Sequence, residues 1–333
     1  MKFIFCGIAA AFFCILGTNL AQAELSCNSH SGYSVADLSQ PVTTITTKNG
    51  KSGGDAFKSI GVKTVARYYA WPEDGIISCK VLLPAESDAI LKSGLSIISV
   101  YQHENDDPET FMKAGRGSGD ATKAVKLAKA NGQPIGSAIY FAVDGVDQTL
   151  KDSVFEYSIN KGGPVSKGRR HRLISADISF NKHIKYYERF RRYHKNIFKK
   201  SAADINATDI LPFVERYFRD VRKTFADSKA GYKIGAYGSG AVCSHLQKLG
   251  LIDYCWLAMS EGWPGFDEQY KSGKWHLAQQ RSTMCKNWKF HEQEKVRFDF
   301  NKINTAKSNF GQWSKKTEPT QLSILPSECK LRW

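Results

Sequence analysis

The sequence predicts an α/β protein with the fold of an irregular (β/α)8 TIM barrel that carries a basic insertion after its fourth strand. Two observations support this prediction. Short apolar runs rich in β-branched and aromatic residues recur along the chain, and helix-like amphipathic segments separate most of them. Strands that alternate with helices indicate a parallel sheet with crossover connections. Eight such strands favour a closed barrel, and an open doubly wound sheet is the alternative.

Eight segments have the composition of strands. They are, in chain order, 43–46, 64–69, 96–101, 137–143, 233–237, 255–259, 275–279 and 296–300. Helical spacing of apolar residues is found in four segments: 83–94, 119–132, 210–231 and 241–250. The first of these has Pro84 near its start and Gly94 at its end, which are common boundary signals of helices. Helices are short or missing between the last three strands, so we expect an irregular barrel.

Residues 148–209 interrupt the alternation and form the expected insertion. Thirteen Lys or Arg residues lie between positions 161 and 200, against two acidic residues, and aromatic residues are interleaved with them. This stretch carries most of the formal net charge of +15. It is either a solvated basic helix or a contact surface for an anionic partner, such as a wall polymer, a phospholipid surface or a nucleic acid.

The chain begins with the pattern of a secretory signal peptide: Lys2, a long apolar run, and the small-residue site Ala-Gln-Ala at 21–23. We therefore expect cleavage near Ala23 and a secreted or periplasmic protein. The rest of the chain is expected to comprise an N-terminal extension at 24–40, the barrel with its insertion at 41–313, and a C-terminal tail at 314–333.

Cysteine usage agrees with export. The cysteines that follow the expected signal peptide are Cys27, Cys79, Cys243, Cys255, Cys285 and Cys329. An even number in an exported protein indicates disulfides, and six cysteines permit fifteen pairings. The sequence has no Cys-x-x-Cys or His-x-x-x-His spacing, and no Gly-x-Gly-x-x-Gly follows an expected strand. We therefore expect neither a metal nor a cofactor.

The candidate site residues lie where the expected strands end, because active sites of (β/α)8 barrels form at the carboxyl ends of the strands. The apolar run Ile-Tyr-Phe-Ala-Val at 139–143 leads directly into Asp144, and Asp147 follows. The candidates for catalysis are Asp144, Glu104 and Asp147. The candidates for substrate binding are Arg67, Tyr68, Tyr101, Gln102, Tyr237, Trp256, Gln279 and Asp299.

These residue types suit a polyhydroxylated ligand, because a sugar presents an apolar ring face and a rim of hydroxyl groups. Hydrolysis of a glycoside needs one carboxylic acid and a second carboxylate. Asp144 with Glu104, Asp147 or Asp299 would supply this pair. Asp147 has a simpler interpretation as a turn or N-cap residue, and Arg67 has one as a structural partner of Asp144 or Asp299.

Several motifs occur in the order seen in one known family: "GVKTVARYY", "ESDAILKSGLSIISVYQ", "GSAIYFAVD", "YKIGAYGSGAVCSHL", "YCWLAMSEGW", "WHLAQQ" and "VRFDFNKI". From about residue 41 to 313, apart from the insertion, the chain resembles the bacterial glycoside-hydrolase-like domain family (domain of unknown function 1906). That family is a TIM-barrel relative of the glycoside hydrolase family 25 lysozymes. The resemblance implies a pocket around Asp144, lined by Arg67, Tyr68, Tyr101, Gln102 and Asp299.

The sequence departs from this family at two points. The lysozymes use an Asp-x-Glu pair at the fourth strand, whereas here the next carboxylate after Asp144 is Asp147. Family members also open with an acidic first strand, and the expected strand at 43–46 contains no acid.

Together these features predict an exported glycoside-hydrolase-like protein that acts on a peptidoglycan-type or other amino-sugar glycan. One alternative is a non-catalytic carbohydrate-binding or envelope protein on the same fold. Another is a secreted effector whose basic insertion, at 161–200, binds an anionic polymer or membrane surface.

Overall fold

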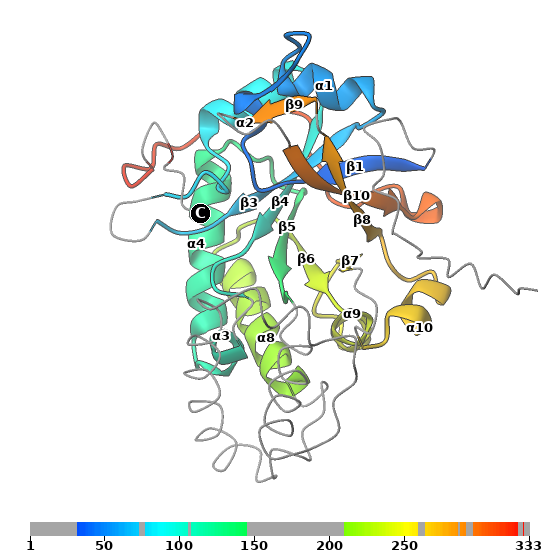
Figure 1. Ribbon diagram of the computed structural model, residues 1–333. Coiled ribbons are helices and arrows are strands. Elements are labelled where there is room, and N and C mark those ends of the chain that lie inside the picture. The colour runs from blue at the N-terminus through cyan, green and yellow to red at the C-terminus, as the bar shows by residue number, and fades with distance from the viewer. Residues whose placement is uncertain are drawn as a thin grey trace, which may run out of the picture.

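The computed structural model describes residues 32–72, 77–105, 108–144, 210–258, 264–285, 287–290, 296–325 and 329, so the expected signal peptide and insertion lie outside the described residues. Eight strands close into a barrel (Figure 1), which confirms the predicted fold class. Their order around the barrel is β1 (Tyr33–Asp37), β10 (Val296–Ile303), β8 (Leu277–Cys285), β7 (Tyr254–Leu257), β6 (Lys233–Gly238), β5 (Ala138–Ala142), β4 (Ser96–Tyr101) and β3 (Thr64–Tyr69).

Strand β10 differs from the others in direction. It is antiparallel to both of its neighbours, β1 and β8, whereas the remaining pairs are parallel. Antiparallel neighbours need no crossover helix. This direction explains why the sequence shows no helical pattern between the last two barrel strands.

The prediction that residues 43–46 form the first barrel strand is wrong. Ile45–Thr47 forms β2, which pairs with β9 (Trp288–Phe290) in a separate two-stranded sheet. The first barrel strand is β1, which lies inside the segment predicted to be an N-terminal extension. Its sequence, Tyr-Ser-Val-Ala-Asp, is short and contains two polar residues, so its apolar signal is weak.

Helices cover the outside of the barrel. The four predicted helices are present as α2 (Pro84–Lys92), α4 (Arg116–Ala130), α8 (Leu211–Asp227) and α9 (Gly240–Lys248). The short helices α1 (Gly53–Ser59), α3 (Pro108–Met112) and α10 (Phe266–Lys271) were not predicted.

Helices α4 and α8 pack side by side (Figure 1). Phe218 of α8 packs edge-on against Phe141 of β5, with ring centroids 6.3 Å apart. Helix α8 therefore covers the outer face of β5. In the described ranges, no helix has the length and apolar character needed to cross a membrane.

The alternation of side chains along the strands divides the apolar core into two layers. The layer inside the barrel consists of Val35, Ala66, Ile98, Val100, Ala138, Tyr140, Ala142, Tyr254, Trp256, Leu277 and Phe310. A larger layer fills the space between the strands and the helices. In β3, Tyr68 belongs to the interior layer and Tyr69 to the outer one, so Arg67 between Ala66 and Tyr68 points outward.

Two disulfides join described residues: Cys79 with Cys329, and Cys243 of α9 with Cys255 of β7. Cys285 is also disulfide-bonded. The prediction of disulfides is confirmed for these cysteines.

Candidate functional site

A group of polar side chains gathers at the carboxyl end of the barrel interior. Asp37 ends β1, Gln102 and Asp144 lie just beyond β4 and β5, and the remaining members come from β3, β6, β8 and β10. The group is Asp37, Tyr68, Gln102, Asp144, Tyr237, Gln279 and Asp299. Asp37 and Gln279 are buried and the others are half-buried, so the site has a buried floor and a rim that reaches solvent.

Asp37 is the buried carboxyl group of this site. Its Oδ2 accepts hydrogen bonds from Asn301 Nδ2 at 2.7 Å and from Gln279 Nε2 at 3.4 Å. Burial, followed by the charge of Asp299, raises the pKa of Asp37 from 3.8 to about 7, although its hydrogen bonds act in the opposite direction. Asp37 therefore retains its proton to a higher pH than an ordinary aspartate does, and it can act as a proton donor.

Gln279, a predicted site residue, connects three members of the group. Its Nε2 also donates to Asp299 Oδ2 at 2.9 Å, and its Oε1 accepts from the hydroxyl of Tyr237 at 2.9 Å. Because an amide donates only through nitrogen and accepts only through oxygen, these partners determine which way the Gln279 side chain faces.

The hydroxyl groups of Tyr68 and Tyr237 lie among the carboxylates. Burial first, and then the charges of Asp37, Asp144 and Asp299, hold the pKa of both tyrosines well above their usual value. Tyr68 donates to Asp37 Oδ1 at 3.4 Å. Both tyrosines keep their protons across the physiological pH range, so they act as hydrogen-bond donors.

Asp144 is held by its backbone and its side chain. Its N–H donates to the carbonyl of Asn105 at 3.1 Å, and its Oδ2 accepts from Gln102 Nε2 at 2.8 Å. Gln102 Oε1 in turn accepts from Lys80 Nζ at 2.7 Å. The Lys80 ammonium also lies 4.2 Å from the ring centroid of Tyr68, a cation–π contact.

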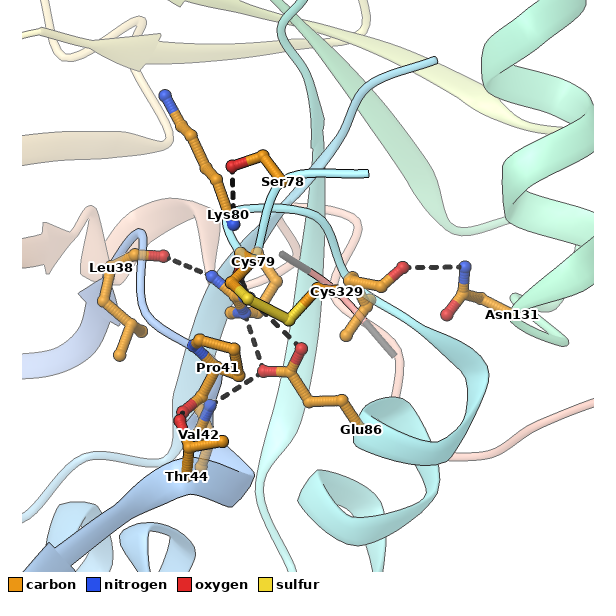
Figure 2. A network of polar contacts seen from close by, with 12 residues as sticks. Leu38, Pro41, Val42, Thr44, Ser78, Cys79, Lys80, Glu86, Asn131 and Cys329 are labelled. Carbon is orange, nitrogen blue, oxygen red and sulfur yellow. Dashed lines mark hydrogen bonds and ion pairs between the residues drawn. A yellow bond between two sulfur atoms is a disulfide. The ribbon is translucent and has the colours of Figure 1, made fainter. Parts of the chain in front are cut away.

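Arg67 is not part of this group, although it was predicted as a site residue. Its side chain is fully buried outside the barrel, where Nε and Nη2 contact the two carboxylate oxygens of Glu86 at 2.8 and 3.1 Å. Nη1 donates to the carbonyl of Leu38 at 2.6 Å, and Nη2 also donates to the carbonyl of Cys79 at 3.1 Å. Figure 2 shows Leu38, Cys79 and Glu86 converging from three separate segments. Arg67 therefore lies outside the barrel, behind the strands that carry the site. Its ion-pair partner is Glu86 rather than Asp144 or Asp299.

Tyr101 and Glu104 also point away from the carboxylates. Tyr101 faces the outer layer, and its hydroxyl donates to the buried Asp120 of α4 at 3.1 Å. The side chain of Glu104 is 59% exposed and pairs with Arg116 Nη1 at 3.2 Å. The predicted pairing of Asp144 with Glu104 therefore has no geometric support, and Asp147 lies outside the described residues.

Trp256 lies inside the barrel beneath the site. It is 1% exposed, and its indole N–H donates to Asn301 Oδ1 at 2.7 Å. Because Asn301 Nδ2 donates to Asp37, Trp256 is connected to the Asp37 carboxyl group through Asn301. It was predicted as a substrate-binding residue, and its burial gives it a supporting position instead.

The sequence analysis missed three residues of the site: Asp37, Lys80 and Asn301. Asp37 was missed because its strand was not recognised, although an acid at the end of the run Val-Ala is the same signal that identified Asp144. Asn301 is two residues beyond the predicted Asp299 and shares its face of β10, so strand alternation would have found it. Lys80 comes from a loop and carries no comparable signal.

The arrangement supplies the groups that glycoside chemistry uses. These are a carboxyl group with a raised pKa, two further carboxylates, and tyrosine and amide donors around them. Among the residues that the structure describes, no group of three or more His, Cys, Asp or Glu side chains is arranged to hold a metal ion.

Comparison with known proteins agrees with this class. Residues 55–160 match the family described as Rv2525c-like, glycoside hydrolase-like domain. For these residues, the match confirms the resemblance to a glycoside-hydrolase-like family that the motifs predicted. An uncharacterised protein of Bacillus subtilis (strain 168), FadG, is 37% identical over 90 residues, which make up 27% of this chain and 15% of FadG.

Two solved structures show more distant similarity. The Tat-secreted protein Rv2525c of Mycobacterium tuberculosis, solved in complex with L-tartrate, is 18% identical, with 85% of this chain and 100% of that chain covered and a TM-score of 0.47. The modular autolysin LytC of Streptococcus pneumoniae, solved with a synthetic peptidoglycan ligand, is 11% identical, with 80% and 46% covered and a TM-score of 0.34. These identities are too low to transfer residue roles from one chain to another.

Proposed function

We propose that this protein is an exported glycoside hydrolase that cleaves a peptidoglycan-type or other amino-sugar glycan, with Asp37 as the acid and Asp144 as the second carboxylate. The observation that carries the proposal is the state of Asp37. Burial and the adjacent Asp299 raise its pKa to about 7, which is the property required of a general acid at neutral pH.

The two carboxyl groups would have different tasks. Asp37 would protonate the glycosidic oxygen as the bond to the sugar breaks, and Asn301 and Gln279 would stabilise the carboxylate that it leaves. Asp144, which accepts a hydrogen bond from Gln102, would act on the opposite side of the bond as nucleophile, base or electrostatic stabiliser. This assignment pairs Asp144 with Asp37 instead of Glu104, whose side chain is directed to Arg116. Asp147 lies outside the described residues and stays a prediction.

The rim suits a sugar ligand. Tyr68 and Tyr237 offer aromatic surface and hydroxyl donors, and the half-buried amide of Gln102 offers a polar edge. The glycoside-hydrolase-like family supports a glycan as the substrate class. Disulfides are typical of proteins in oxidising compartments, which supports export.

The basic segment at 161–200 would bind an anionic polymer or membrane surface beside the site. In sequence it belongs to the stretch between two described residues, Asp144 of the site and Ile210. Its excess of Lys and Arg is the basis of this part of the proposal.

A non-catalytic carbohydrate-binding protein is the second candidate. The feature that favours it is Glu104, which is exposed and directed to Arg116 rather than to Asp144. A protein of this kind would keep the rim and the glycan affinity without a working pair of carboxyl groups.

The deciding experiment measures new reducing ends released from purified peptidoglycan and from chitin-type oligosaccharides. Wild type is compared with Asp144→Ala and Asp37→Asn, and pull-down on the same polymers is measured in parallel. Release by wild type alone supports the hydrolase. No release by any of the three proteins, with binding retained, supports the carbohydrate-binding protein. Deletion of 161–200 tests the basic segment, because salt-sensitive binding to anionic polymers should disappear with it.

A further inference from the structure

We propose that Lys80 is a positioning residue of this site and that the disulfide between Cys79 and Cys329 holds the turn that presents it. For its effect on turnover, this inference rests on the proposed function. Lys80 does not lie on a barrel strand. It reaches the site from the loop between β3 and α2, and its half-buried ammonium contacts both Gln102 and the ring of Tyr68.

The contact with Lys80 determines the orientation of Gln102. An ammonium group only donates hydrogen bonds, so the Gln102 atom that faces Lys80 Nζ at 2.7 Å is the acceptor Oε1. The amide nitrogen must then face the other way, where it donates to Asp144 Oδ2 at 2.8 Å. Without the ammonium, the Gln102 side chain gains freedom to rotate, and Asp144 loses a fixed donor.

The turn that carries Lys80 is attached to β3 and to Arg67. The N–H of Leu82 donates to the carbonyl of Tyr68 at 2.8 Å, and the N–H of Val81 closes the turn on the carbonyl of Ser78 at 2.9 Å. The carbonyl of Cys79 accepts from Arg67 Nη2 at 3.1 Å. Arg67 also donates to the carbonyl of Leu38, the residue after Asp37, so one buried guanidinium holds the backbone next to Lys80 and next to Asp37.

The C-terminal tail completes this attachment. Cys329 is bonded to Cys79, the residue immediately before Lys80, across a sequence separation of 250 residues. Leu325 and Cys329 pack against a small apolar cluster formed by the turn residues Ile77, Val81 and Leu83.

Further along the tail, the N–H groups of Thr317 and Thr320 donate to the carbonyls of Gly132 and Lys129 at 2.8 and 3.0 Å. These contacts fix the tail to the end of α4 and the turn that follows. The tail therefore holds the turn that carries Lys80 in place. Reduction of the Cys79–Cys329 disulfide would release this turn and so change the geometry around Asp144.

The test compares four variants with wild type: Lys80→Met, Lys80→Arg, Cys329→Ser and the double variant Lys80→Met/Cys329→Ser. Lys92→Met, at an exposed lysine at the end of α2, is the control for loss of one positive charge. We expect Lys80→Met to lower kcat about 10- to 100-fold with little change in KM, because a misplaced catalytic group costs turnover more than binding. Lys80→Arg should recover most of the loss, since it also presents only donors.

The double variant separates this mechanism from a general loss of stability. If the disulfide acts through Lys80, Cys329→Ser lowers kcat, and the double variant is no slower than Lys80→Met alone. Additive losses in the double variant, or wild-type kcat in Lys80→Met, would overturn the proposal.

A measurement without substrate keeps the inference separate from the proposed function. The side-chain amide of Gln102 should give a protected NMR signal in wild type that loses protection in Lys80→Met and in Cys329→Ser, but not in Lys92→Met. If wild type cleaves no glycan while these signals change as stated, the proposed function fails and the positioning role stands. If the Gln102 signal is unaffected by both variants, the positioning role fails whatever the activity.

Discussion

Asp37 and Asp299 are register partners across the antiparallel strands β1 and β10, and the amide of Gln279 donates to both carboxylates. Two neighbouring acidic side chains do not ionise independently, because the charge on one disfavours the charge on the other. Asp37 is the more deeply buried of the two, at 5% exposure, so it is the one that retains the proton. The pairing of β1 with β10 thus places Asp299 beside Asp37, and this charge adds to the effect of burial on the pKa of Asp37.

The first prediction concerns the pH dependence of activity. The pKa of Asp37 is about 7, and only its protonated form acts as an acid, so kcat/KM should fall above about pH 7. Asp37→Asn should lower kcat by about 10²- to 10⁴-fold and abolish this alkaline limb. Initial rates of reducing-end release between pH 4 and 9 check both statements. An unchanged alkaline limb in Asp37→Asn would assign the acid to another residue.

The second prediction concerns Asp299→Asn, which should lower the pKa of Asp37, whereas burial raises it. Removing the neighbouring charge lowers the pKa of Asp37, so the alkaline limb should move to lower pH while the reaction continues. The same pH–rate profiles measure this shift. A limb that stays in place would mean that Asp299 does not influence the acid.

The third prediction concerns stability. The pKa of Asp37 is 3.8 in its ordinary state and about 7 in the folded protein, so the folded state binds the extra proton between these values. The resulting stabilisation is fully present below about pH 3.8 and is lost as the pH rises to about 7. Relative to wild type, Asp37→Asn should therefore gain free energy of unfolding across this window, by about 4 kcal/mol in total. Urea unfolding at pH 4, 5.5 and 8 measures the difference, and a constant difference would contradict the prediction.

Much of the barrel could be predicted from sequence, because buried strands and amphipathic helices leave a strong apolar pattern. Seven of the eight predicted barrel strands occur in the barrel, and the exception shows the limit of the method. The segment at 43–46 has good strand composition, but composition does not say which strand it will pair with. β1 was missed because a strand of five residues with polar members gives little apolar signal.

The site was predicted less completely, for a geometric reason. Adjacent residues at a strand end were assigned to one pocket, yet successive side chains face opposite sides of the sheet. Tyr68 and Gln102 therefore reach the site, whereas Arg67 and Tyr101 face the helices. Lys80 could not be predicted, because it lies in a loop, and the preceding residue, Cys79, is bonded to Cys329 across a sequence separation of 250 residues.

The fourth prediction concerns the ion pair of Arg67 and Glu86. Both side chains are at least 95% buried, so Arg67→Met leaves the Glu86 carboxylate without its partner and should lower the free energy of unfolding by about 3–5 kcal/mol. Arg67→Met/Glu86→Gln should lose less than the two single variants combined, since no unpaired charge remains. Arg219→Ala, which removes an exposed ion pair with Glu215 on α8, is the control and should cost at most about 0.5 kcal/mol. Equal losses in Arg67→Met and the control would contradict the assigned role.

The fifth prediction tests whether Trp256 acts on Asp37 through Asn301 rather than by contact with a ligand. Trp256→Phe removes the indole donor to Asn301 Oδ1, so Asn301 is free to turn its amide away from Asp37. The hydrogen bond from Asn301 lowers the pKa of Asp37, so its weakening should raise that pKa and move the alkaline limb to higher pH, opposite to Asp299→Asn. The free energy of unfolding should fall by about 1–3 kcal/mol, the cost of an unpaired buried polar group.

Trp275→Phe is the matched control for Trp256→Phe. Trp275 is also buried, and its indole N–H donates to the carbonyl of Tyr270 at 2.9 Å, a partner in α10 outside the barrel. Its replacement should cost a similar free energy and leave the pH–rate profile unchanged. A shift of the alkaline limb in both variants would trace the effect to general loosening of the fold, whereas a shift in Trp256→Phe alone traces it to the path through Asn301 to Asp37.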